Sequence, residues 1–434
     1  MDYTEVLVLV ISFVVLLAVG VPIAYSIGLS TIITMLVSIM PMPAFTTIAQ
    51  RMGTGLDSFA LLAIPFFILA GQLMNSGGIA HRLIEFAKVI VGPIPGGLAF
   101  VNIIANMLFG AISGSAAAAA SAIGGFMHPR MVKEGYDGAY AAAVNITSST
   151  TGLIIPPSNV LIVYALAAGG VGVSIGSLFL AGYLPGILLG LGLMVVTGFI
   201  AVRRKYPTAE PVSLKFALVK MLDALPSLLL LFIVIGGIVA GIFTATEASA
   251  VAVLYTFVLS VFIYKEVKFK DLRGIFLSTI NTTSIVMLLI ATSIGMSWVM
   301  SYENIPQTVS DALMSFGESK LTVLLIINAI LLFVGVFMDM TPAVLIFTPI
   351  FLPVVMKLGL DPVHFGIMMV MNLSIGLCTP PVGSVLFIGC SVGKIGIEKV
   401  IKPLIPMYFA MILVLMLVTY VPWISMWLPR LFGF

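Results

Sequence analysis

Long apolar segments follow one another along almost the whole chain, and they constrain the fold more than any other feature. Of the 434 residues, 61% are hydrophobic and 9% are charged. Many segments are long enough to cross the hydrocarbon of a bilayer as helices. The opening stretch, MDYTEVLVLVISFVVLLAVG, has no basic residue and no signal-cleavage site, so we expect a retained first helix. The sequence predicts an all-α polytopic membrane protein without a soluble domain.

Lys and Arg residues are concentrated in two short stretches, at 203–220 and 265–273. Basic loops tend to stay on the cytoplasmic side, so both stretches are expected there. Two apolar segments between them, 225–243 and 246–264, would carry the chain across the membrane and back. The segment VSLKFALVKML is amphipathic, and it is either a horizontal interfacial helix or a solvated loop.

Few residues are of the types that hold metals, disulfides or nucleic acid. The two cysteines, Cys378 and Cys390, lie in apolar sequence, so neither a disulfide framework nor a cysteine metal site is expected. The three histidines are too scattered for a metal cluster. We expect no nucleic-acid partner.

Adjacent prolines interrupt an apolar segment in SSTTGLIIPPSN, residues 148–159. Proline has no backbone N–H, so in a helix Pro156 would leave the carbonyl of Gly152 without its donor, and Pro157 would do the same to Leu153. A free carbonyl in hydrocarbon costs several kcal/mol unless it faces protein, a watery cavity or an ion. The pattern predicts a broken helix.

The same interruption recurs 224 residues later. Without a gap, 129–157 matches 353–381 at eight positions, where chance gives about two. Pro380 and Pro381 would free the carbonyls of Gly376 and Leu377 in the same way. Corresponding breaks in two apolar halves indicate the binding site of a transporter.

Hydroxyl side chains lie next to both breaks, at Ser149, Thr150, Ser374 and Thr379. Together with the freed carbonyls they offer the oxygen ligands that a small hard cation prefers. The structural alternative is a pair of kinks whose backbone is satisfied by neighbouring Ser and Thr residues.

A polar tip precedes each break, within 107–125 and within 332–351. The apolar arms around ISGSA and MDMTP are short for a span, which predicts re-entrant hairpins; close packing through the alanine run is the alternative for the first. Asp339 is costly in hydrocarbon and is therefore a functional candidate, unless it is a helix-end residue in water. Helix N-termini at the tips would favour an anionic substrate.

A family resemblance emerges from these motifs taken in order. The matching stretches are RMGTGLDSFALLAIPFFILAGQLMNSGGIAHRL (51–83), FGAISGSA (109–116), GYD (135–137), IIPPSN (154–159), SLFLAGYLPG (177–186), GIFTATEASA (241–250), GVFMDMTPA (335–343) and GLCTPPVG (376–383). They resemble the large membrane subunit of tripartite ATP-independent periplasmic (TRAP) transporters, from about residue 5 to residue 430.

The resemblance implies an inverted-repeat elevator fold of the ion-transporter superfamily, with two re-entrant hairpins and two broken helices. The domains that follow from it are N-terminal scaffold helices (1–90), a first transport-domain repeat (91–180), scaffold helices with amphipathic arms (181–320), a second transport-domain repeat (321–400) and a C-terminal helix (401–434). It implies a secondary active transporter, and not an enzyme.

The same resemblance implies roles for individual residues. The sodium ligands would be Ser113, Ser115, Gly152, Gly335, Asp339, Gly376 and Thr379. The substrate contacts would be Ser113, Ser115, Ser158, Asn159, Asp339 and Thr341. No arginine lies near either break, which leaves Arg51, expected in a loop, as a weak candidate for the anion contact.

The implied activity is sodium-driven uptake of an organic acid across the bacterial inner membrane. The implied partners are a small four-helix membrane subunit (Q-type), a periplasmic substrate-binding protein and the lipid bilayer. Family members that carry small dicarboxylates often have PPSIP after the first break, whereas this chain has PPSNV. The extra amide looks more like the sialic-acid branch, so sialic acid is the first choice and a C4-dicarboxylate the second.

Two other functions remain open from the sequence. A stand-alone sodium/carboxylate symporter or sodium/proton antiporter of the same superfamily would share the repeat and need no binding protein. An intramembrane serine hydrolase is suggested by Ser113 and Ser115 among glycines, but no histidine or lysine is placed to act as its base.

Overall fold

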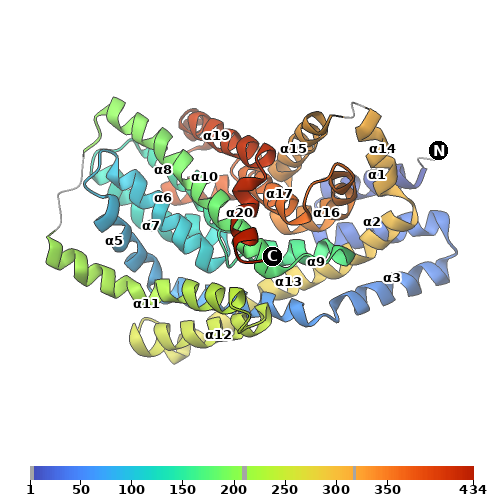
Figure 1. Ribbon diagram of the computed structural model, residues 1–434, viewed down its shortest axis with the longest axis horizontal. Coiled ribbons are helices and arrows are strands. Elements are labelled where there is room, and N and C mark those ends of the chain that lie inside the picture. The colour runs from blue at the N-terminus through green and yellow to red at the C-terminus, as the bar shows by residue number, and fades with distance from the viewer. Residues whose placement is uncertain (1–3, 208–212, 316–318) are drawn as a thin grey trace.

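The computed structural model describes residues 4–207, 213–315 and 319–434, and all regular secondary structure in these ranges is helical (Figure 1). The α-helices are α1 Thr4–Ala18, α2 Ile23–Ser38, α3 Pro41–Leu56, α4 Ala63–Ser76, α5 Ile79–Val91, α6 Gly97–Ser113, α7 Ala116–Lys133, α8 Gly138–Ser149, α9 Asn159–Ala167, α10 Ile175–Arg204, α11 Leu214–Val239, α12 Ala245–Phe257, α13 Phe269–Tyr302, α14 Ile305–Ser315, α15 Lys320–Phe337, α16 Met340–Lys357, α17 Pro362–Gly376, α18 Ser384–Gly393, α19 Ile397–Tyr420 and α20 Trp423–Leu431. Short 3₁₀ segments lie at η1 Phe59–Leu62, η2 Thr151–Leu153 and η3 Gly169–Val171, and a π-helical segment, η4 Val258–Ile263, extends α12.

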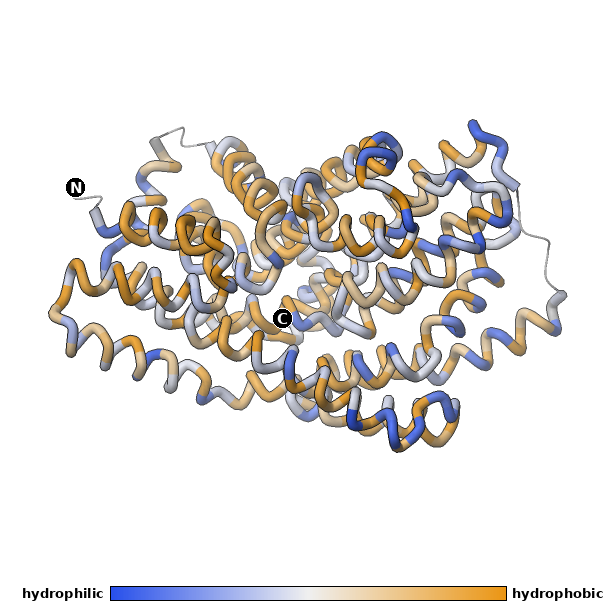
Figure 2. Tube along the Cα trace, turned by 180° about the vertical axis from the view of Figure 1, so that it is seen from behind, coloured by the Kyte–Doolittle hydropathy of each residue, from blue (hydrophilic) through white to orange (hydrophobic). Residues whose placement is uncertain are grey.

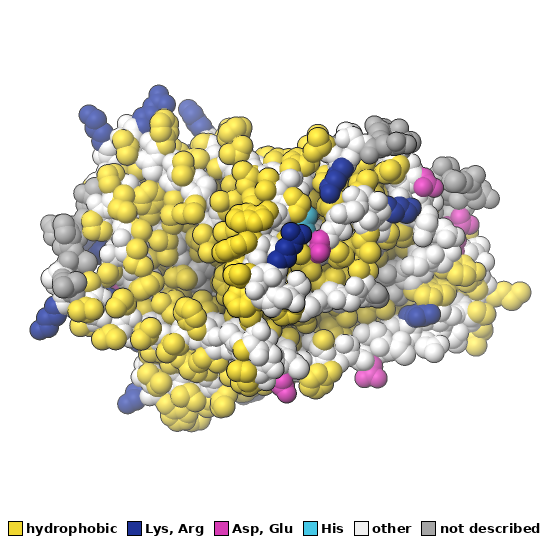
Figure 3. Space-filling view, viewed as in Figure 1, with side chains coloured by type: hydrophobic (Ala, Val, Ile, Leu, Met, Phe, Trp, Pro, Cys, Tyr) yellow, Lys and Arg dark blue, Asp and Glu magenta, His cyan; other side chains and the backbone are white. Residues whose placement is uncertain are grey.

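Eight stretches among the described residues are long and apolar enough to cross a membrane. They include α10, α13 and α19, and hydrophobic residues run along most of the outer helices (Figure 2). Figure 3 shows a face that is mainly hydrophobic, with several Lys and Arg side chains at its left and upper-left edges. Large apolar side chains on the outer helices are exposed, such as Val195 (73%), Phe232 (75%) and Phe409 (71%). The predicted all-α polytopic membrane protein is confirmed.

Apart from Val212, which lies outside the described residues, the amphipathic segment predicted as a horizontal helix or a loop forms the start of α11 and its N-cap. Ser213 caps the helix, because its side chain accepts a hydrogen bond from the backbone N–H of Phe216 at 3.3 Å. The helix then continues through Pro226 to Val239. The loop alternative is therefore wrong, and the segment is continuous with the predicted span.

The interior of the molecule is built around α8 and α17, the two helices that end at the proline pairs. Every residue of α17 from Val363 to Gly376 is buried, and so is every residue of α8 from Tyr140 to Ser149. The breaks thus lie inside protein, and both Pro–Pro peptide bonds are cis.

A helical hairpin precedes each broken helix, as predicted. The first consists of α6 and α7, and the second of α15 and α16. The arms contain 17 or 18 residues and therefore extend beyond the predicted ranges 107–125 and 332–351, and both arms of the second hairpin are among the eight stretches long and apolar enough to cross a membrane. In each half the hairpin is followed by the broken helix, a short helix (α9 or α18) and a long helix (α10 or α19).

Glycine pairs bring the first arm of each hairpin into direct backbone contact with its broken helix. A Cβ atom on Gly152 would lie 2.5 Å from Gly110 Cα, and one on Gly376 would lie 2.5 Å from Gly335 Cα. Real Cβ atoms do not approach this closely, so Gly152 and Gly376 require glycine at the observed separation, as does Gly110, whose added Cβ would lie 2.9 Å from Gly152 Cα.

Buried amide side chains join the same pairs of helices. In the first half, Asn106 Nδ2 on α6 donates to Asn145 Oδ1 at 3.1 Å and to Ser148 Oγ at 2.8 Å, both on α8. In the second half, Asn372 Nδ2 on α17 donates to Asn328 Oδ1 on α15 at 2.8 Å. Buried polar groups are costly unless paired, so these networks fix how each hairpin sits on its broken helix.

We predict that Gly376→Ala lowers the free energy of unfolding by about 1–3 kcal/mol, because the new methyl group would overlap the backbone of Gly335. The matched control is Gly236→Ala in α11, where an added Cβ meets no atom within 4 Å. Thermal unfolding of the purified variants in detergent measures the difference. Equal midpoints for the two variants would contradict the glycine contact.

Candidate functional site

Both hairpin tips and both helix breaks meet at one cavity of about 230 Å³. The first tip contributes Ser115 and the second contributes Asp339, while Leu153 and Leu377 come from the two breaks. These positions are far apart in the sequence, and the repeat brings them together. The prediction that the breaks and the tips form a single site is consistent with this arrangement.

A second cavity of about 250 Å³ continues the first, because the two share residues of both tips. Its further lining comes from Gln72 and Asn75 on α4, from Asn159 on α9 and from Thr282 on α13. We call the two together the tip cavity. One wall belongs to the hairpins and breaks, and the other belongs to helices expected in the scaffold.

Four helices begin at the tip cavity. Ser115 caps α7 and Asp339 caps α16, while Val160 lies in the first turn of α9 and Ser384 begins α18. The N-terminus of a helix carries a partial positive charge and free N–H groups. The cavity is therefore favourable for an anion although no Lys or Arg side chain lines it among the described residues.

Asp339 brings a negative charge to the same cavity. Its Oδ1 accepts a hydrogen bond from the backbone N–H of Met340 at 3.0 Å, so it is the helix cap that the alternative interpretation proposed. Its side chain is exposed toward the cavity, however, and among the described residues it has no basic partner within ion-pair distance. Asp339 can therefore cap α16 and also bind a ligand in the cavity.

Two serine hydroxyls at the site are buried without a partner in the described part of the chain. They belong to Ser113, which ends the first arm of hairpin 1, and to Ser158, which precedes α9. Side-chain oxygens in protein interiors are nearly always paired, so an unpaired pair of hydroxyls next to a cavity favours ligand binding. Ser113 lines the tip cavity, and Ser158 lies beside Asn159, which does so.

Gly114 permits the first tip to approach Asn159. It has a φ of 63°, which side chains other than glycine rarely adopt, and an added Cβ would lie 3.0 Å from Asn159 Nδ2. The amide of Asn159 therefore contacts the hairpin tip and faces the cavity. Ser113, Ser115, Asn159, Asp339 and Thr341, all predicted from the sequence, come together here.

The predicted free carbonyls are found at the first break only. No donor among the described residues reaches the carbonyl of Gly152 or Leu153. In the second break the prediction was wrong, because the chain turns back on itself after the prolines. The Thr379 N–H donates to the Gly376 carbonyl at 2.9 Å, and the Val385 N–H donates to the Leu377 carbonyl at 3.0 Å.

The hydroxyls next to the breaks donate to the preceding helical turn. Thr379 Oγ1 donates to the Ile375 carbonyl at 2.7 Å, Ser374 Oγ to Met371 at 2.7 Å, Ser149 Oγ to Ile146 at 2.9 Å and Thr150 Oγ1 to Thr147 at 2.9 Å. A hydroxyl that donates its proton still has lone pairs for a cation. The sodium roles of Gly152, Gly335, Gly376 and Thr379 stay predictions, and none of these four residues lines the tip cavity.

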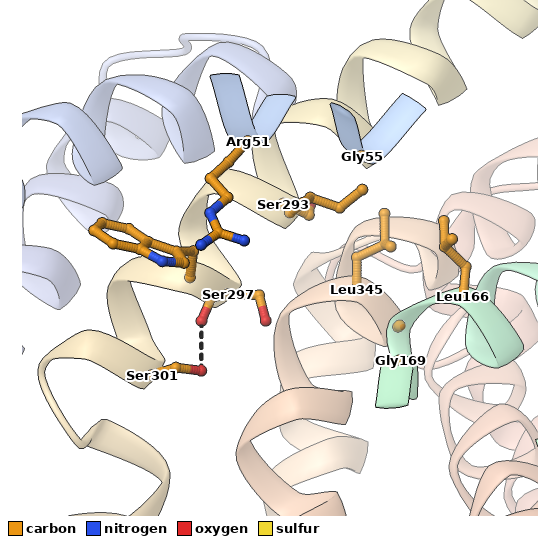
Figure 4. A pocket seen from close by; sticks show the side chains of 11 residues that line it. Arg51, Gly55, Leu166, Gly169, Ser293, Ser297, Ser301 and Leu345 are labelled. Carbon is orange, nitrogen blue, oxygen red and sulfur yellow. Dashed lines mark hydrogen bonds between the residues drawn. The ribbon is translucent and has the colours of Figure 1, made fainter. Parts of the chain in front are cut away.

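Arg51 lies elsewhere. It is in α3, not in the expected loop, and it lines a separate cavity with Ser293 and Ser297 of α13 (Figure 4). It therefore does not contact the tip cavity in this conformation.

Sequence reasoning missed Gln72, Asn75 and Thr282. They lie in α4 and α13, apolar helices without a Pro–Pro pair, so only their polarity within those helices marked them.

The family model of the DctM component of tripartite ATP-independent periplasmic transporters matches residues 10–424. The chain belongs to this family. It is 56% identical over 428 residues to an uncharacterized protein, YgiK, of Salmonella typhimurium, which covers 99% of this chain and 98% of that protein. It is 40% identical over 431 residues to the C4-dicarboxylate TRAP transporter large permease protein DctM of Rhodobacter capsulatus, covering 97% and 98%.

A sialic acid TRAP transporter large permease protein, SiaM of Vibrio cholerae, is 39% identical over 384 residues, which cover 88% of this chain and 89% of that one. Among solved structures, the YdaH transporter of Alcanivorax borkumensis superposes with a TM-score of 0.66 at 13% identity, over 89% of each chain. The predicted family and transporter fold are confirmed. The relatives are named as permeases, which favours a transporter over the serine hydrolase.

We predict that Ser113→Ala changes the free energy of unfolding by less than about 0.5 kcal/mol, because the hydroxyl has no protein partner to lose. Uptake of the transported acid should fall about tenfold or more. The matched control is Ser249→Ala, whose buried hydroxyl donates to the Thr246 carbonyl at 2.6 Å and does not line the tip cavity. That variant should lose about 1 kcal/mol of stability and keep normal uptake. Normal uptake by Ser113→Ala would show that its hydroxyl is no ligand.

Proposed function

We propose that this DctM-family permease takes up an organic carboxylate together with sodium ions. The observation that carries the proposal is Asp339, an unpaired carboxylate in a cavity that four helix N-termini make favourable for an anion. An anionic substrate beside a bare carboxylate would be repelled. A cation bound nearby removes the repulsion, so the two ligands favour each other.

The oxygen ligands near the tips suit sodium. The unpaired hydroxyls of Ser113 and Ser158 and the free carbonyls of the first break are hard, neutral oxygens. The carboxylate of Asp339 supplies the only formal negative charge among the described lining residues of the tip cavity. A proton on Asp339 would neutralise the charge without using those oxygens, which is why we favour sodium over a proton.

Sialic acid is our first candidate substrate, and a C4-dicarboxylate is the second. Three amides, those of Gln72, Asn75 and Asn159, line the tip cavity and can both donate and accept hydrogen bonds. A polyhydroxylated acid with an N-acetyl group would use both capacities, whereas an ionised dicarboxylate only accepts. The relatives named for the two substrates are almost equally similar to this chain, at 39% and 40% identity.

The proposed partners are a small four-helix membrane subunit and a periplasmic binding protein, because the family is tripartite. We place the complex in the bacterial inner membrane. The tip cavity has one wall from the hairpins and the other from α4 and α13, so an elevator movement of the hairpins and broken helices along these scaffold helices would carry the bound ligands across.

Uptake should therefore require an inward sodium gradient, the small subunit and the loaded binding protein together. Proteoliposomes that omit one component at a time test this. Sodium-driven uptake by this chain alone would identify a stand-alone symporter, and uptake that follows a proton gradient without sodium would contradict the proposed coupling.

Asp339→Asn should preserve the helix cap, because the amide oxygen still accepts from Met340, but remove the charge. We predict that uptake falls about a hundredfold, equivalent to about 2.7 kcal/mol, and that sodium no longer stabilises the protein against heat. The control is Asp361→Asn, since Asp361 caps α17 by accepting from the Val363 N–H at 2.8 Å and lies outside the tip cavity. Equal uptake by the two variants would contradict the proposed role of Asp339 in sodium-coupled uptake.

A further inference from the structure

A cavity of about 370 Å³ lies apart from the tip cavity, between α3 and α13 on one side and α9, η3 and α16 on the other. Figure 4 shows Arg51 reaching from α3 across α13 toward Ser297, opposite Leu166 and Leu345. We call it the Arg51 cavity. Like the tip cavity, it has one wall from the expected scaffold and one from the expected transport domain.

Arg51 has no carboxylate partner among the described residues. Its guanidinium carbon lies 5.6 Å from the centre of the Trp298 ring, so the group is held over an aromatic face and keeps its donors free. A planar guanidinium with free donors matches the two oxygens of a carboxylate.

A second group in the Arg51 cavity lacks a partner. Ser293 is 2% exposed, and its hydroxyl has no hydrogen-bond partner in the described part of the protein. About two helical turns further on, Ser301 Oγ already donates to the carbonyl of Ser297 at 2.9 Å (Figure 4). The buried Ser293 hydroxyl is thus available to a ligand that also contacts Arg51, which lines the same cavity.

The scaffold side of the Arg51 cavity is firmly packed. An added Cβ on Gly55 would lie 2.5 Å from Ile294 Cδ1, so α3 and α13 are in close contact at the level of the cavity. Arg51 lies one turn before Gly55, and Ser293 is adjacent to Ile294. The side chains of Arg51 and Ser293 are therefore both carried by helices that are already packed together before a ligand binds.

The Arg51 cavity lies nearer the periplasm than the tip cavity does. Basic residues at 265–273 place the start of α13 on the cytoplasmic side. Thr282 of the tip cavity comes first along α13, and Ser293 follows 11 residues later, about 16 Å further toward the periplasm. A ligand that enters from the periplasm passes this level before it reaches the hairpin tips.

We propose that the Arg51 cavity is an entry site, where Arg51 and Ser293 bind the carboxylate of the incoming acid before it reaches the hairpin tips. This inference rests on the proposed function for the identity of the ligand. It gives the substrate a basic contact that the tip cavity lacks. The entry site is distinct from the sodium site, since it contains no acidic side chain in the described chain.

Cysteine labelling tests the entry site without relying on transport. In Ser297→Cys, the new thiol lines the Arg51 cavity, so a maleimide should label it. The native Cys378 and Cys390 are both buried and should add little background labelling. N-acetylneuraminate or succinate should slow the labelling about tenfold when saturating. Adding Arg51→Ala should abolish this protection, and Arg51→Lys should restore part of it. Labelling rates that neither acid changes, or protection that persists in Arg51→Ala, would overturn the proposal.

A lipid phosphate is the competing ligand for an arginine near the membrane surface. Protection by nanodiscs that contain phosphatidylglycerol, but by neither acid, would also overturn the entry site. This readout stays valid if sodium-coupled uptake itself is absent, so failure of the proposed function and failure of the entry site are distinguishable.

Uptake kinetics provide the second readout. Arg51→Ala should raise the KM for the acid about tenfold, with an unchanged maximal rate and an unchanged sodium requirement. The control is Arg430→Ala in α20, an exposed arginine with no ion pair in the described part of the chain, which should keep the normal KM. A lowered maximal rate at unchanged KM in Arg51→Ala would contradict an entry role.

Discussion

The prolines that end α8 and α17 inside the protein impose the constraint on which the rest of the site depends. They stop two buried helices where no water can satisfy the interrupted backbone, so every freed polar group must find a partner within the molecule or bind a ligand. The second break closes through the N–H groups of Thr379 and Val385. The first leaves two carbonyls open, and the hydroxyls of Ser113 and Ser158 also lack partners in the described part of the chain.

Together with the hairpins, these breaks form a site that favours both an anion and a cation. Contacts such as Gly335 against Gly376 hold each hairpin against its broken helix, and four helix N-termini then face one cavity together with Asp339. The N-termini favour an anion, and the carboxylate with the neutral oxygens favours a cation. Each bound ligand reduces the electrostatic repulsion that the other ligand would meet, so binding of either one raises the affinity for the other.

Features that depend on local chemistry were predictable from the sequence. The proline pairs, the polar tips and the 224-residue offset gave both broken helices and both hairpins, because each follows from residues close together in the chain. Features that depend on contacts between distant parts of the chain were not predictable from the sequence. The hydrogen bond from Val385 to Leu377 spans a turn that no local pattern specifies, and Gln72 and Thr282 reach the cavity only because α4 and α13 pack against the hairpins.

Equilibrium binding of radiolabelled sodium to the purified protein, with and without the transported acid, addresses the coupling between the two ligands. The electrostatic arrangement around Asp339 predicts saturable sodium binding that potassium does not match, and a higher sodium affinity when the acid is present. Absence of saturable sodium binding, or a sodium affinity that the acid leaves unchanged, would contradict it.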